Sequence, residues 1–182
     1  MELVDTVKYF AKFPLRSGVL KCFADDNSTV PGYSDLKNYI TALPQNGLFP
    51  DIKNFIISID EKKISDQIKS MDGFFMYLEY AGIIGTALDN LRNRDVDFKW
   101  AIIIGYNWNG RSNDSMAEIL IMDRIIEIIN QIAIIIKQDD AQTCANKRLL
   151  DSAFNLTPIP PYLLYQNHGW ELSFSKRTKI MQ

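Results

Sequence analysis

Apolar and polar residues follow two different periodicities along the chain, and these periodicities predict where helices and strands occur. In residues 1–51, apolar positions recur every three or four residues, which predicts a helix ending before Pro14 and a second helix capped by Ser34. A short extended piece is expected at 18–23. Beyond residue 51, alternating or continuously apolar runs predict strands at 54–59, 73–84, 98–105 and 169–175, with a short helix at 60–70.

The longest periodic segment, residues 114–138, predicts one long helix in the C-terminal half of the chain. Its polar residues fall at spacings of three, four and seven. Almost all of the remaining positions are apolar, chiefly isoleucine. A narrow polar stripe beside a wide apolar surface indicates a helix that packs on more than one surface. We expect one of those surfaces to belong to another subunit. The polar positions are Asp123, Glu127, Asn130, Gln131, Lys137 and Gln138.

Together these elements predict an α+β fold in a single domain spanning residues 1–182. A small, mostly antiparallel sheet is expected to pack against the long helix, with residues 52–182 forming this core and residues 1–51 forming a helical N-terminal extension. The continuously apolar run at 98–105 is typical of a central strand covered on both faces. In the final strand, Trp170, Leu172 and Phe174 alternate with polar residues, which predicts one buried face.

Composition narrows the possible partners. The 182 residues carry a net charge of -2, and the cationic residues are scattered, so we expect no direct nucleic-acid binding. The most apolar segment, 119–136, is interrupted by charged and amide residues, which argues against a membrane span. Cys22 and Cys144 lack metal-type spacing, so both are expected to be reduced thiols of a cytoplasmic protein.

A possible phosphate-binding motif occurs at residues 105–112 (GYNWNGRS), between an apolar strand and the long helix. Arg111 stands where a P-loop has lysine, and a planar guanidinium does not replace a compact ammonium. Tyr106 and Trp108 are bulky for a loop that wraps its amides around phosphates. We therefore favour a strand-to-helix turn in which Asn109-Gly110 supplies the bend and Ser112 or a neighbour caps the helix. A nucleotide-binding enzyme using Gly105 to Ser112 stays as the less favoured alternative.

Other catalytic chemistry has little support in the sequence. The single histidine, His168, precedes a glycine and is expected in a turn, although a serine or cysteine triad would need it as the base. Asp95 and Asp97 are expected to be solvated charges in an exposed connection, because they match no calcium-binding loop. We predict no catalytic residue, no metal site and no cofactor.

Residues suited to protein contact cluster around the turn before the long helix. Tyr106, Trp108 and Arg111 have the composition of an interface hot spot, whereas a stacking platform for nucleic acid would have more basic neighbours. With Glu127 and Gln131 from the polar stripe of the helix, they form the predicted interface.

The order of elements resembles that of the small α+β proteins that complete phage tails and necks, of the tail-terminator or head–tail joining type. The segments that carry the resemblance are 73–84, 98–105, 114–138 and 169–175, whereas residues 1–51 are an addition. The resemblance implies a non-enzymatic structural subunit that forms a hexameric ring by edge-to-edge contact and touches neighbouring tail or neck proteins. It also implies a location in the host cytoplasm and then in the virion. The alternative is a small intracellular protein-binding or regulatory module that forms a dimer or a hetero-complex.

Overall fold

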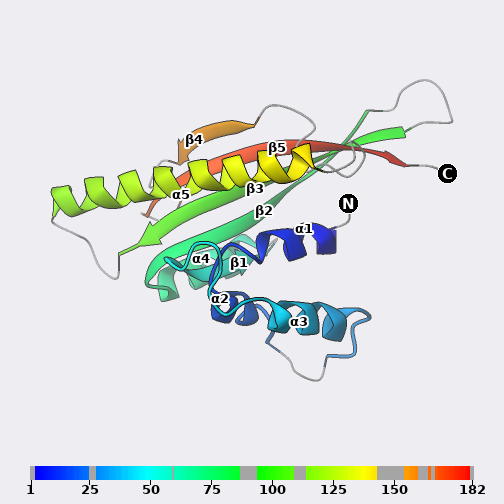
Figure 1. Cartoon of the computed structure of the whole chain (residues 1–182), viewed down its shortest axis with the longest axis horizontal. Coiled ribbons are helices and arrows are strands. Elements are labelled where there is room, and N and C mark those ends of the chain that lie inside the picture. Colours follow the sequence, from blue (N-terminus) through cyan, green and yellow to red (C-terminus); the bar gives the residue numbers. More distant parts are fainter. Residues whose placement is uncertain are drawn as a thin grey trace.

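The computed structural model describes residues 3–24, 28–58, 60–86, 94–108, 114–142, 154–159, 164 and 167–180. Within these ranges the helices are α1 (Leu3–Phe10), α2 (Arg16–Leu20), α3 (Tyr33–Ala42), α4 (Glu61–Ser70) and α5 (Ser115–Ala141). The strands are β1 (Ile52–Ile57), β2 (Gly73–Thr86), β3 (Arg94–Asn107), β4 (Asn155–Ile159) and β5 (His168–Ile180) (Figure 1).

The strands form one sheet in the order β1-β2-β3-β5-β4. The pair β1–β2 is parallel and joined through α4, whereas the other neighbouring pairs are antiparallel. The predicted α+β class, with a mostly antiparallel sheet and one long helix, is confirmed. β3 lies at the centre, and its neighbouring residues Ile102 and Ile103 are buried in different apolar clusters. The prediction of a central strand covered on both faces is therefore confirmed.

One face of the sheet, which we call the α5 face, packs against the long helix. α5 lies along β3 and β5 (Figure 1), and α1 and α2 contribute to the same core, in which Phe10 lies near Phe174 with ring centroids 6.0 Å apart. This shared core joins the first 51 residues to the rest of the chain. The sheet residues of this core include Met76, Leu78, Trp100, Ile102, Ile104, Leu172 and Phe174.

The opposite face of the sheet is covered in part by α4. Asp60 caps this helix by accepting hydrogen bonds from the backbone amides of Lys62 (3.0 Å) and Lys63 (3.3 Å), which satisfies two of its unpaired N–H groups. Ile64 and Ile68 then lie one turn apart and pack against the sheet. The apolar residues that they join are Ile56, Phe75, Tyr77, Ile103 and Leu164.

Two local expectations for the N-terminal region are wrong. Residues 16–20 form α2 rather than an extended piece. So short a segment has a weak helical tendency of its own, and tertiary packing stabilises the helix. Gly18 makes this packing possible, since a Cβ atom there would lie 2.4 Å from the carbonyl oxygen of Lys53 in β1. The cap of α3 is Gly32 in a left-handed conformation (φ 80°) rather than Ser34.

Two further expectations placed strand residues in loops. His168 is the first residue of β5 and pairs with Tyr106 of β3, so it does not lie in a turn. Asp95 and Asp97 lie within β3 rather than in a connection, and they pair with Lys179 and Arg177 of β5. The sequence did not predict a strand at these positions, because charged residues are depleted from half-buried pleated surfaces.

Candidate interaction surface

The long helix α5 buries one side completely and exposes the other. Asp114 caps it by accepting hydrogen bonds from the amides of Met116 and Ala117, both at 3.1 Å, and its C-terminal part packs into the α5 face. Among the described helices, none is long and apolar enough to cross a membrane. The isoleucines of the buried side are Ile125, Ile128, Ile129, Ile132 and Ile136.

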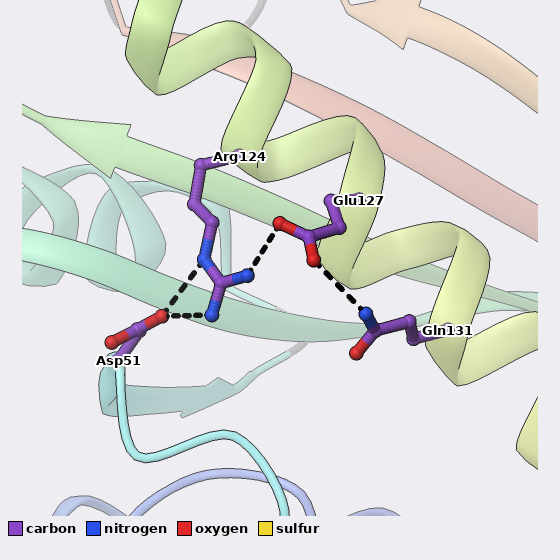
Figure 2. A network of polar contacts seen from close by, with 4 residues as sticks. All are labelled: Asp51, Arg124, Glu127 and Gln131. Atoms are coloured by element: carbon purple, nitrogen blue, oxygen red, sulfur yellow. Dashed lines mark hydrogen bonds and ion pairs between the residues drawn. The ribbon is translucent and has the colours of Figure 1, made fainter.

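The polar stripe predicted from the sequence lies on the exposed side, and a hydrogen-bonded network runs along it (Figure 2). Arg124 donates to Oδ2 of Asp51 through Nε (2.9 Å) and through Nη2, and to Oε2 of Glu127 through Nη1 (2.5 Å). Nε2 of Gln131 donates to the other oxygen of Glu127 at 3.1 Å. Hydrogen bonds to Asp51 and then Glu127 raise the pKa of Arg124. The network fixes the helix against the segment that leads into β1.

The first two turns of α5 break this pattern, because their exposed side is apolar. Met116, Ile119 and Leu120 are 66%, 59% and 67% exposed. They lie seven, four and three residues before Asp123, so they continue the exposed stripe in the direction of the N-terminus. These turns also extend beyond the ends of β2 and β3 (Figure 1). We call Met116, Ile119 and Leu120 the α5 tip, and its position leaves it without cover from the sheet.

Aromatic residues lie at the same end of the molecule, where β3 ends. The ring of Tyr106 packs edge-on against Phe74 (4.8 Å between centroids) and against Trp108 (5.0 Å). Tyr106 and Trp108 are half-buried. The indole Nε1 of Trp108 is buried, and no described residue accepts a hydrogen bond from it. Phe74, Tyr106 and Trp108 form a row of contacting rings, which we call the aromatic row. This row supports the end of β3, from which the chain leads to the α5 tip.

The predicted interface residues thus fall into three groups. Tyr106 and Trp108 belong to the aromatic row, Glu127 and Gln131 bond to each other on the exposed side of α5, and Arg111 lies outside the described residues. The α5 tip was not among the predicted residues. Extending the polar stripe backward from Asp123 at helical spacing would have shown that it turns apolar there.

The first half of the candidate phosphate loop is part of the sheet. Gly105, Tyr106 and Asn107 belong to β3 and pair with both β2 and, up to Tyr106, β5. A Cβ atom at Gly105 would lie 2.4 Å from the ring of Phe75, so packing explains this glycine. The amide Nδ2 of Asn107 donates to the carbonyl oxygens of Ile68 and Met71 (2.8 Å to the latter). Backbone and side chain here serve the sheet and α4, which weighs against phosphate binding. Residues 109–113 lie outside the description.

Two carboxylates share the face of the sheet opposite α5. Glu79 on β2 and Glu171 on β5 lie on either side of β3, in neighbouring rows of the sheet. Burial, and secondly the charge of Glu171, raises the pKa of Glu79. Among the described residues, no group of three or more histidine, cysteine or acidic side chains is placed to hold a metal ion.

Cys22, which lies within the described residues, has a thiol of low reactivity. Burial raises the pKa of the Cys22 thiol to about 11, although a backbone hydrogen bond opposes the shift. A thiol with such a pKa carries little thiolate near neutral pH and is a poor nucleophile. Its Sγ lies 3.4 Å from the carbonyl oxygen of Phe55, which accepts its hydrogen bond. Cys144 lies outside the described residues.

No protein family, curated protein or solved structure was found to match this chain.

Proposed function

We propose that this protein is a non-enzymatic structural subunit that works by assembling with other protein chains. The observation that carries the proposal is the α5 tip, where three large apolar side chains are exposed on the projecting turns of a long, well-anchored helix. Contiguous exposed apolar residues mark sites of protein contact more often than isolated ones do. The Arg124 network and the buried isoleucines hold the helix in place, so the tip is presented on a rigid support.

The size of the tip sets the strength of the contact that it provides. Fully burying one such side chain is worth about 1.5–3 kcal/mol, so completing the burial of three side chains that are about two-thirds exposed is worth roughly 3–6 kcal/mol. Association costs at least about 4 kcal/mol in lost translational and rotational freedom. The tip by itself therefore supports a weak contact, and a stable assembly needs a further contact elsewhere on the subunit.

The narrower proposal is a subunit of a phage tail or neck, in which the chains form a ring and touch neighbouring tail or neck proteins. Its support is the order β2, β3, α5, β4 and β5, a long antiparallel hairpin followed by one long helix and a final strand. The ring, its hexameric number and the location in the virion are parts of this proposal. A discrete dimer or hetero-complex would instead favour the protein-binding module.

The test compares the assembly of the native chain with that of a charged tip variant. Met116→Asp, Ile119→Asp and Leu120→Asp are combined, because acidic residues suit the first turns of a helix and leave α5 intact. The matched control places the same charges on exposed polar residues in the second half of α5 and at its C-cap, as Asn130→Asp, Gln138→Glu and Gln142→Glu. Sedimentation velocity, native mass spectrometry and negative-stain microscopy report the mass and shape of each.

We expect the native chain and the control to form concentration-dependent assemblies, and the tip variant to lose at least tenfold in association constant with an unchanged melting temperature. Ring-shaped particles would support the tail or neck assignment. A native chain that stays strictly monomeric at millimolar concentration, with no ring, would overturn the proposal.

A further inference from the structure

The three central strands extend past their outer neighbours and leave two strand edges open. β1 pairs with β2 from Phe74 to Leu78, and β4 pairs with β5 from Gly169 to Ser173. β2, β3 and β5 continue together, as far as the pair Arg94–Ile180. In the described part of the chain, no strand pairs with residues 79–86 of β2 or with residues 174–180 of β5 on their outer sides. This three-stranded extension lies at the end of the molecule opposite the α5 tip (Figure 1).

The two open edges differ in charge. Residues 174–180 of β5 include Lys176, Arg177 and Lys179, whereas residues 80–86 of β2 (YAGIIGT) carry no charge. Cationic residues on an edge strand oppose pairing with another chain, and an uncharged apolar edge presents its free N–H and C=O groups as a template for pairing. The edge of β5 is therefore protected, and the edge of β2 is not.

The β2 edge is also regular over most of its open length. The bulge in β2 occurs between Tyr80 and Gly82, just beyond the end of β1, and from Gly82 to Thr86 the ladder to β3 is unbroken. A regular edge presents alternate N–H and C=O groups at the spacing that another strand needs. The bulge thus separates the stretch beside β1 from the regular open stretch, Gly82 to Thr86.

We propose that residues 82–86 of β2 pair antiparallel with the same residues of a second copy, joining two sheets across a twofold axis. In this arrangement each β1 occupies residues 74–78 of its own β2 and leaves the next stretch for the partner, so the two open stretches are self-complementary. β5 of a second copy would instead bring three cations against a stretch, residues 80–86, that has no carboxylate to meet them. This proposal does not depend on the α5 tip.

Hydrogen exchange measured residue by residue provides the direct test, in the charged tip variant so that the two contacts are separated. We expect a dimer by sedimentation. Alternate amides within residues 82–86 should exchange at least tenfold more slowly as the protein concentration rises, while the outer amides of residues 175–180 stay unchanged. Ile83→Lys and Ile84→Lys, made separately, should each weaken the dimer at least tenfold. Thr178→Lys, which adds the same charge to β5, should not.

Three results would overturn the proposal. The first is a tip variant that is strictly monomeric and exchanges these amides at a rate independent of concentration. The second is protection of both edges together with masses that grow beyond two copies, which would show β2 pairing with β5. The third is a dimer that both lysine variants leave unchanged. If the dimer forms while the tip variant and the native chain show identical masses, the β2 contact stands and the proposed role of the tip fails.

Discussion

Arg124 on α5 and Asp51 just before β1 are joined by two hydrogen bonds that meet on one oxygen, Oδ2 of Asp51. The pair connects the middle of the long helix to the start of the sheet, 73 residues away in sequence. Its side chains are 37% and 43% exposed. Solvent therefore screens the interaction, although its two-donor geometry is better than that of a single surface contact.

We expect Arg124→Ala to lower the free energy of unfolding by about 1 kcal/mol, near the upper end for partly exposed ion pairs. A double-mutant cycle with Asp51→Ala, measured by urea denaturation, should give a coupling energy of about 0.5–1 kcal/mol that decreases in high salt. The cycle of Lys53→Ala with Asp51→Ala is the control and should show no coupling. A coupling near zero between Arg124 and Asp51 at low salt would contradict this account.

Gly105 and Phe75 provide a second prediction. It tests whether Gly105 is a glycine because of packing against Phe75 or because of phosphate binding. Gly105→Ala places a methyl group against the Phe75 ring, with 2.4 Å to its nearest atom, and the strand cannot move without disturbing both neighbours. We expect a loss of about 1–3 kcal/mol in urea denaturation, typical of overpacking. Phe75→Leu should recover part of this loss in the double variant, because the smaller side chain gives the methyl group room.

The nucleotide-binding alternative makes the opposite prediction for the same region. A phosphate loop would give a thermal shift with Mg-ATP or Mg-GTP that disappears in Arg111→Ala. We expect no shift at millimolar nucleotide, for either the native chain or this variant. Gly105 pairs with β2 in the sheet, and the side chain of Asn107 bonds to the backbone at the end of α4. A reproducible shift that depends on Arg111 would contradict the packing explanation.

Much of the fold follows from periodicity, because its main elements have one strongly buried side. α5 was predicted at 114–138 and spans Ser115–Ala141, capped by Asp114. β5 buries Leu172 and Phe174 as its alternation indicated. α2 was missed because a five-residue helix containing glycine has no visible period, and its position depends on contact with β1.

The interaction surface was less predictable for a physical reason. The sequence shows that α5 has more apolar positions than one packing surface requires, but it does not show how far the helix extends beyond the sheet. That overhang decides which positions stay exposed, and it depends on the lengths of β2 and β3 and on where α5 begins. Glu127 and Gln131 were predicted as contacts for their place on the stripe, where they bond to each other.

Glu79 gives a prediction that depends on pH. Its pKa is raised in the folded chain, by burial and secondly by Glu171, so the folded state holds its proton more tightly than the unfolded state does. Below the ordinary pKa near 4.5 both states are protonated and there is no cost. Above it the folded state must bury a charge. We expect Glu79→Gln to raise the free energy of unfolding at neutral pH by less than about 1 kcal/mol after solvent screening.

This gain should disappear as the pH falls below about 4, and urea denaturation at several pH values measures it. Asp66→Asn, on the exposed surface of α4, is the control for removing a negative charge from a solvent-exposed position. A gain from Glu79→Gln that is equally large in acid would show that shape, rather than charge burial, is responsible.

The last prediction concerns the polar cluster that joins α1 to the end of α5. Oδ2 of Asp139 accepts hydrogen bonds from the hydroxyl of Tyr9 and from Nζ of Lys12, both at 2.6 Å. We expect Tyr9→Phe to cost about 1 kcal/mol at neutral pH, the usual net value of one hydrogen bond. Tyr39→Phe is the matched control, since Tyr39 is exposed on α3.

The cost of Tyr9→Phe should decrease at both ends of the pH scale. Burial opposes ionisation of Asp139, but the hydrogen bonds from Lys12 and Tyr9 outweigh it and lower the pKa of this carboxyl. Its contribution is therefore present above the ordinary pKa of 3.8 and is lost as the pH falls through the lowered value. Burial, and then Asp139, raises the pKa of Tyr9 above its ordinary 10.0, so the stability from its proton is lost as the pH rises beyond that value. Thermal unfolding across this range measures the decrease at low pH and the decrease at high pH. A cost that stays constant from acid to alkali would contradict a role for the hydrogen bond from Tyr9 to ionised Asp139.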